Sequence, residues 1–139
     1  MSLDPETRKA TVLYRIEKAK STWDDALFCI DKEMWNMAAN RMYYALFHTV
    51  SALLIANSIP ANTHRGFHIQ MNKYLVQDGT MTKEEARLVR HLFDLRHEDD
   101  YEDFIDATKE DVMEYLPQAK ALIDKLISLN KLAPANNSN

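Results

Sequence analysis

The chain has 139 residues, 46% of them hydrophobic and 27% charged, with a formal net charge of −4, which is the balance of one ordinary globular domain. Its two glycines, Gly66 and Gly79, cannot form a Walker A loop or a dinucleotide-binding glycine turn, and a β-rich fold would need more turn glycines. The single Cys29 excludes an internal disulfide and a multi-cysteine zinc site, and without a long apolar run or a signal sequence we expect a cytoplasmic protein outside the membrane.

Apolar spacing predicts two long helices in the first half of the chain. The first spans about residues 5–30, with Asp4 as a possible N-cap and Pro5 in the first turn, and its apolar residues recur at steps of three and four. The second spans about residues 34–57 and is apolar over most of its circumference. Such a helix is usually central and covered on several sides.

Two shorter helices are expected next. The third spans about residues 65–77 and ends at Asp78-Gly79. The fourth begins with a capping box at Thr82 and Glu85, in which the two side chains satisfy backbone N–H groups reciprocally, and it runs to about residue 96.

The fifth helix is predicted to begin after the N-cap Thr108 and to run to about residue 130, with Pro117 producing a kink or a late start. The fold class is therefore all-α, an antiparallel four- to five-helix up-and-down bundle. We expect one domain over residues 1–131 and a disordered tail over 132–139.

A polar stripe interrupts the apolar second helix. It consists of Asn40, Arg41, Tyr44 and His48. In a central helix these groups are at least partly buried, and a buried arginine needs an acidic or carbonyl partner. The nearest acids at an element boundary follow the fourth helix, so we predict that Arg41 faces Asp99 or Asp100. The alternative is an ion pair that locks the bundle and has no chemical role.

Charge is unevenly distributed along the chain. Residues 98–111 carry eight acids and Lys109, a net charge of −7, so the remaining residues carry +3. A phosphate backbone would be repelled by this acidic stretch and tolerated by the rest. A solvated loop that leads into a helix would explain the same stretch.

Histidines and tyrosines elsewhere offer weaker signals. His64 and His68 have the i, i+4 spacing of metal-ligating pairs, but the sequence shows no evident third ligand nearby. The rings of Tyr43, Tyr44 and Tyr101 are suited either to stacking on bases or to packing in the core.

Three pieces of sequence occur together in a particular order. They are Asn40-Arg-Met-Tyr-Tyr-Ala45, Thr63-His-Arg-Gly66, and Arg96 with Asp100-Tyr101. On these pieces the chain resembles, over about residues 8–130, the HEPN domain (higher eukaryotes and prokaryotes nucleotide-binding) in its small stand-alone prokaryotic branch. The resemblance implies a helical bundle and a homodimer. It also implies a minimal nucleotidyltransferase partner, as in toxin–antitoxin systems, and binding of a nucleotide or RNA.

Many HEPN proteins are metal-independent endoribonucleases, with a motif of an arginine followed after four to six residues by a histidine. The histidine moves a proton and the arginine stabilises charge on the phosphate, so neither a metal nor a cofactor is implied. Arg96 fits the arginine, but residues 101–103 are Tyr, Glu and Asp. The candidate histidines that remain are His97 and His48.

We therefore interpret the chain first as a HEPN-like module that dimerises and binds a nucleotide, RNA or a nucleotidyltransferase partner. The candidate binding residues are Asn40, Arg41, Tyr44, His48, Arg96, Asp100 and Tyr101. One alternative is a metal-independent ribonuclease toxin that uses Arg96 with His97 or His48. Another is a purely structural interaction protein.

Overall fold

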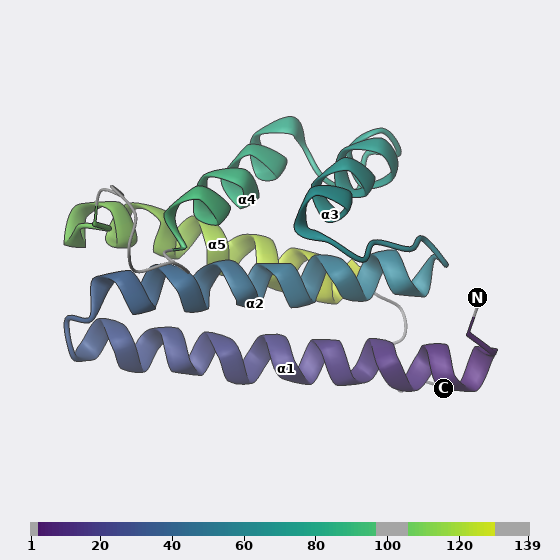
Figure 1. Ribbon diagram of the computed structural model, residues 1–139, viewed down its shortest axis with the longest axis horizontal. Coiled ribbons are helices and arrows are strands. Elements are labelled where there is room, and N and C mark those ends of the chain that lie inside the picture. The colour runs from purple at the N-terminus through teal and green to yellow at the C-terminus, as the bar shows by residue number, and fades with distance from the viewer. Residues whose placement is uncertain (1–2, 97–105, 130–139) are drawn as a thin grey trace.

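The computed structural model describes residues 3–96 and 106–129, and these form helices and no strand (Figure 1). The elements are α1 (Pro5–Asp31), α2 (Trp35–Ala56), α3 (His64–Gln70), the π-helical η1 (Met71–Val76), α4 (Lys83–Leu95) and α5 (Lys109–Leu129). The predicted all-α bundle is confirmed, and the predicted helices lie within a few residues of the observed ones.

Helices α1 and α2 form a long antiparallel hairpin and lie side by side (Figure 1). The Asp4 side chain caps α1 by accepting a hydrogen bond from the backbone N–H of Thr7 at 2.8 Å. The turn between the helices is short and places Glu33 at a φ of 56°. Cys29 is buried near the end of α1, as an apolar group would be.

Helix α2 is the centre of the molecule, as its sequence predicted. It packs against α1, α4 and α5. Met42, Tyr43 and Leu46 are fully buried within it. Trp23 of α1 and Met42 thus belong to the core, whereas Phe93 of α4 packs against it while only partly buried.

The third predicted helix is divided into two segments. It begins at His64 and changes to π-helical geometry over Met71–Val76. A side-chain bond accompanies the change: Nδ2 of Asn72 donates to the backbone carbonyl of His68 at 2.8 Å, the acceptor that the Asn72 backbone N–H would use in a regular α-helix. This competition is not visible in apolar spacing.

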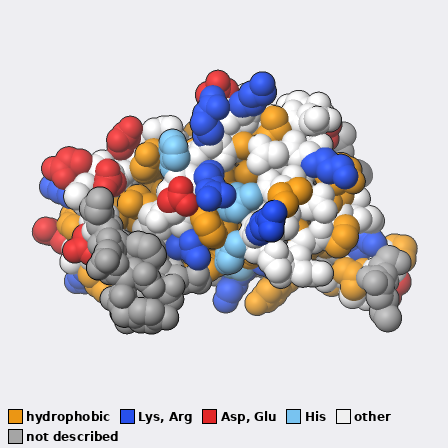
Figure 2. All heavy atoms as spheres, turned by 45° about the horizontal axis from the view of Figure 1, so that its top comes forward, with side chains coloured by type: hydrophobic (Ala, Val, Ile, Leu, Met, Phe, Trp, Pro, Cys, Tyr) orange, Lys and Arg blue, Asp and Glu red, His pale blue; other side chains and the backbone are white. Residues whose placement is uncertain are grey.

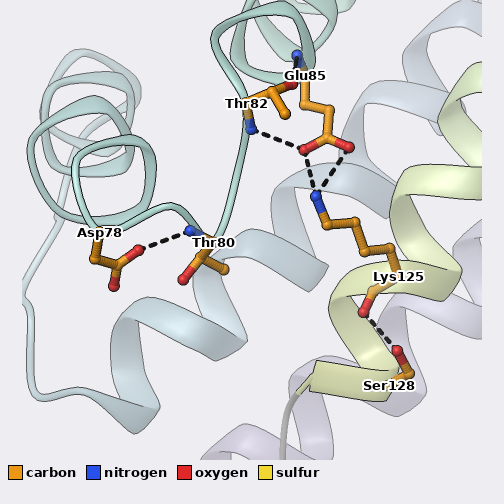
Figure 3. A network of polar contacts seen from close by, with 6 residues as sticks. All are labelled: Asp78, Thr80, Thr82, Glu85, Lys125 and Ser128. Atoms are coloured by element: carbon orange, nitrogen blue, oxygen red, sulfur yellow. Dashed lines mark hydrogen bonds and ion pairs between the residues drawn. The ribbon is translucent and has the colours of Figure 1, made fainter.

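The turn before α4 contains a left-handed glycine and is followed by a capping box, and Figure 3 shows the capping box. Gly79 has a φ of 85°, and Asp78 accepts a hydrogen bond from the Thr80 N–H at 2.9 Å. Thr82 Oγ1 accepts from the Glu85 N–H at 3.0 Å and Glu85 Oε1 accepts from the Thr82 N–H at 2.9 Å, which confirms the predicted box. Glu85 also pairs with Lys125 Nζ at 2.8 Å and so joins α4 to α5.

Helix α5 begins at Lys109, where Thr108 Oγ1 accepts a hydrogen bond from the Asp111 N–H at 3.0 Å. Pro117 lies inside the helix and does not delay its start. The segment before α5 is attached to α2, because Asn36 Oδ1 accepts from the Ala107 N–H at 2.7 Å. No helix within residues 3–96 and 106–129 combines the length and apolar character that crossing a membrane requires.

Candidate functional site

Aromatic rings and cationic groups gather where α2, α3 and the end of α4 meet. We call this group the aromatic–basic cluster, and it comprises Tyr43, Tyr44, Phe47, His64, His68, Phe93 and Arg96. Figure 2 shows histidine side chains and Lys or Arg side chains next to one another near the middle of this face. Tyr43 and His68 are buried, and the other members are partly buried.

His64 sits between two tyrosines of α2. The hydroxyl of Tyr43 lies 3.0 Å from His64 Nδ1, and the hydroxyl of Tyr44 lies 3.3 Å from His64 Nε2. A neutral imidazole has one donor and one acceptor nitrogen, so one hydroxyl then accepts and the other donates. These contacts hold the imidazole in one orientation.

The local sequence places His64 at the start of α3. Thr63 caps this helix by accepting a hydrogen bond from the Gly66 N–H at 2.9 Å. A Cβ at position 66 would lie 3.2 Å from Thr63 Oγ1, so glycine gives the cap room. The Thr-His-Arg-Gly piece therefore positions the histidine.

Arg96 stacks on the same group of rings from the end of α4. Its guanidinium carbon lies 3.9 Å from the centroid of Phe93, and its Nη1 donates to the Phe93 carbonyl at 2.7 Å. The His64 ring lies 5.3 Å from Phe93, centroid to centroid. Arg96 and His64 therefore share one ring as a neighbour, although 32 positions separate them in the sequence.

The predicted polar stripe is partly buried throughout, as expected, and it is divided between two environments. Asn40 Oδ1 accepts from Arg41 Nε at 3.0 Å and from Nη2 at 2.7 Å, and the Arg41 guanidinium lies 5.5 Å from the Tyr44 ring. The other end of the stripe faces α1, because His48 Nδ1 lies 2.9 Å from Nη1 of Arg15.

His68 within the cluster and His48 beside it are both neutral at pH 7. Burial, followed by the charges of Arg15, Lys18 and Arg41, lowers the pKa of His48 to about 4. Burial and the charge of Arg90 are the largest effects that lower the pKa of His68 to about 4. Desolvation is thus the main cause of both shifts, and the charges of nearby arginines add to it.

Comparison with known protein families identifies the chain. The HEPN domain family matches residues 12–130. The chain belongs to the HEPN family. The resemblance carried by the three sequence pieces is thereby confirmed.

Relatives of this HEPN chain occur in bacteria and archaea. It is 30% identical over 122 residues to a UPF0332 protein of Thermotoga maritima, covering 88% of this chain and 92% of that protein. It is 26% identical over 127 residues to a protein named "Putative toxin" from Methanocaldococcus jannaschii, covering 88% and 86%. A UPF0332 protein of Archaeoglobus fulgidus is 26% identical over 115 residues, covering 80% and 88%.

Some predicted site residues of this HEPN chain fall outside the described part. They are His97, Asp99, Asp100 and Tyr101. The predicted pairing of Arg41 with Asp99 or Asp100 therefore stays a prediction, as does a catalytic pair of Arg96 with His97. Within the described part, Tyr44 and Arg96 belong to the cluster, Arg41 contacts it through Tyr44, and His48 adjoins it through Phe47 at 5.6 Å.

Sequence reasoning missed three contributions to this HEPN site. It considered His64 as half of a metal-ligating pair with His68, whereas both of its nitrogens contact tyrosine hydroxyls. It did not single out Arg15, which faces the stripe from α1, or the role of Phe93 as a shared wall. Among the described residues, no three His, Cys, Asp or Glu side chains are grouped to hold a metal ion. The sequence signals for His64 were its place in the Thr-His-Arg-Gly piece and its i, i+4 spacing from His68, and neither indicates the two tyrosine contacts.

Proposed function

We propose that this HEPN protein dimerises and binds single-stranded RNA at the aromatic–basic cluster, as one component of a toxin-type two-protein system with a nucleotidyltransferase. The observation that carries the proposal is the stacking of Arg96 on Phe93, a ring that His64 links to the partly exposed Tyr44. Arginine provides bidentate contacts to phosphate, and exposed aromatic faces stack on unpaired bases.

Two further observations support RNA as the ligand. Burial is the largest cause of the lowered pKa values of His48 and His68 and arginine charges come second, so guanidinium groups that can bind phosphate lie close to both histidines. Two archaeal relatives carry the name "Putative toxin", which supports the toxin-type role. A two-fold dimer through this face would bring two copies of Arg96 together and double the charge.

RNA binding is tested by fluorescence anisotropy with a labelled single-stranded RNA in EDTA. We expect Arg96→Ala to weaken binding about tenfold or more, since it removes a charged phosphate contact and a stacked group. Lys9→Ala on the opposite helix α1 is the matched loss of one positive charge and should change affinity little. Equal affinity of the wild type and Arg96→Ala, or no binding by the wild type, would refute the proposal.

One observation favours a second function, a metal-independent ribonuclease. His64 and Arg96 contact the same ring, so the fold supplies a histidine near the family arginine where the motif positions 101–103 supply none. Its imidazole would take the proton of the ribose 2′-hydroxyl as that oxygen bonds to phosphorus, and would give a proton to the 5′-oxygen as its bond to phosphorus breaks, while Arg96 stabilises the phosphate.

Cleavage of the labelled RNA in EDTA tests this second function. Loss of cleavage in both Arg96→Ala and His64→Gln, with His48→Gln still active, would establish it with His64 as the proton carrier. If His64→Gln still cleaves the RNA and His97→Gln does not, the proton carrier is His97, as the sequence predicted. If the wild type binds the RNA and the RNA stays intact, the ribonuclease function is refuted and only the binding function stands.

A further inference from the structure

A second basic surface lies beside the cluster, in the groove between η1 and α4. The groove holds a hollow of about 500 Å³ whose polar lining comes from Lys83, Arg87 and Arg90 of α4, with His68, Asn72 and Gln77 opposite. An adjoining hollow of about 490 Å³ shares His68, Asn72 and Gln77 and adds Lys73.

The walls of this groove are basic. Lys83, Arg87 and Arg90 are spaced by four and three residues, so they line one face of α4. None of the described residues that line either hollow is acidic. Arg87 and Arg90 do have carboxylates beside them, Glu84 at 3.5 Å and Asp94 at 3.4 Å, but these pairs are solvent-exposed and weak. A phosphate can compete with them.

The opposite wall supplies side-chain amide groups. Asn72 lies in the π-helical segment η1 and Gln77 caps that segment, and both side chains line the two hollows. Side-chain amides at this position can donate to phosphate or ribose oxygens.

The groove is continuous with the aromatic–basic cluster. The Arg90 guanidinium lies 5.3 Å from the Phe93 ring, the same ring on which Arg96 stacks. His68 lines both hollows and lies 4.9 Å from Phe93, centroid to centroid. Figure 2 shows the Lys and Arg side chains of this face continuing from its middle toward its upper edge.

We infer that the groove between η1 and α4 carries the sugar–phosphate backbone of a single-stranded RNA that extends beyond the nucleotides held at the cluster. The inference rests on the proposed function, because the strand is anchored at Arg96 and Tyr44. Positive side chains along a groove track a nucleic-acid backbone without reading its sequence. The groove therefore adds affinity for long strands and leaves affinity for short ones unchanged.

The test compares two labelled RNAs, one of about four nucleotides and one of about 12, in EDTA over a range of salt concentrations. The variant is Lys83→Gln, Arg87→Gln, Arg90→Gln. We expect it to bind the long RNA at least about tenfold more weakly, with the slope of log affinity against log salt reduced by about 2, since each phosphate contact contributes about 0.7 for single strands. The short RNA should bind as it does to the wild type.

A matched control removes three positive charges at positions that do not line the groove. The variant Lys9→Gln, Lys20→Gln, Lys109→Gln changes exposed lysines of α1 and α5 and should reduce the slope for the long RNA by less than about 1. Thermal unfolding checks that both triple variants are folded. If the groove variant unfolds, Lys83→Gln alone should reduce the slope by about 0.7.

The outcomes separate the two proposals. If the groove variant binds the long RNA as the wild type does, or loses affinity for both RNAs equally, the groove is not a backbone track and RNA binding at the cluster stands. If the wild type binds neither RNA, both proposals fail.

Discussion

Arg15 of α1 and His48 of α2 are joined by a contact of 2.9 Å between Nη1 and Nδ1. A guanidinium can only donate, so Nδ1 of His48 accepts and the imidazole is neutral in this contact. Burial first and the charge of Arg15 second lower the pKa of His48 from 6.5 to about 4. Protonation of His48 at Nδ1 would therefore break this contact between α1 and the polar stripe.

This relationship predicts that the folded state loses stability in mild acid. The pKa of His48 is lower in the folded state than in the unfolded one, so its contribution is present above 6.5 and is lost as pH falls from 6.5 toward 4. The pKa of His68 is also lowered to about 4, so its contribution to stability is lost over the same pH range. The two shifts together amount to about 4 kcal/mol between pH 7.5 and pH 5, and solvent screening at the partly exposed His48 reduces this. We expect the free energy of unfolding, from urea titrations, to be lower by roughly 2–4 kcal/mol at about pH 5 than at about pH 7.5.

The contribution of His48 can be isolated by substitution. In His48→Gln the fall in unfolding free energy over this window should be smaller, because one of the two histidines no longer titrates. In Arg15→Met the pKa of His48, followed by NMR, should rise from about 4 while burial keeps it below 6.5. A His48 that titrates near 6.5 in the wild type would contradict the argument.

The contact between Glu85 and Lys125 predicts measurable coupling between α4 and α5. Although burial raises the pKa of Glu85, the hydrogen bonds from Lys125 and from Thr82 hold it below its ordinary value. A double-mutant cycle with Glu85→Gln and Lys125→Met should give a coupling of about 1 kcal/mol in unfolding free energy, because the carboxylate is partly buried and already fixed by the cap.

An ion pair on α5 itself provides the comparison. Lys120 and Asp124 lie 2.9 Å apart, but both side chains are about half exposed. The same cycle there should give about 0.5 kcal/mol or less, the usual value for an exposed i, i+4 pair. Equal coupling energies in the two double-mutant cycles would show that holding Glu85 in the capping box does not strengthen its pairing with Lys125.

Most of the fold was predictable because its signals are local. The capping box at Thr82 and the N-cap at Thr108 fix helix starts within one turn, and apolar spacing identified α2 as central. The division of α3 from η1 was not predictable, because it depends on which donor the His68 carbonyl accepts, a competition that involves the side chain of Asn72.

The candidate site was predictable only in part, for a related reason. The polar residues of α2 were visible because they interrupt an apolar helix, so Tyr44 and His48 stood out. His64 did not, because its significance comes from two tyrosines 20 and 21 positions earlier. Arg15 belongs to an ordinary amphipathic helix, where one basic residue among five carries no signal of what it faces.

Gly79 offers a test of the turn that joins η1 to α4. Its φ of 85° lies in the left-handed region, and a Cβ there would meet no atom within 4 Å, so the cost of a side chain is one of backbone conformation alone. Gly79→Ala should lower the free energy of unfolding by about 1 kcal/mol, and Gly79→Asn by less, because asparagine tolerates this region better. Urea unfolding measures both, and an alanine variant as stable as the wild type would contradict the strain argument.

The pair of tyrosines around His64 gives the last prediction. Tyr43 is fully buried and its hydroxyl is 3.0 Å from His64 Nδ1, whereas Tyr44 is partly exposed and its hydroxyl is 3.3 Å from Nε2. Removing a buried hydrogen-bond partner costs more than removing one that water can replace. Tyr43→Phe should therefore lower the unfolding free energy by about 1 kcal/mol, and Tyr44→Phe by about half of that or less.

The effects of substitutions at the two tyrosines on RNA affinity should differ from their effects on stability. Phenylalanine keeps the ring that stacks on a base, so Tyr44→Phe should bind nearly as well as the wild type. Tyr44→Ala should bind RNA about tenfold or more weakly, since stacking contributes about 1–3 kcal/mol per base. If Tyr44→Ala binds RNA normally while Tyr43→Phe remains destabilised, the tyrosines only position His64, and base stacking must be sought elsewhere on the face that carries Arg96.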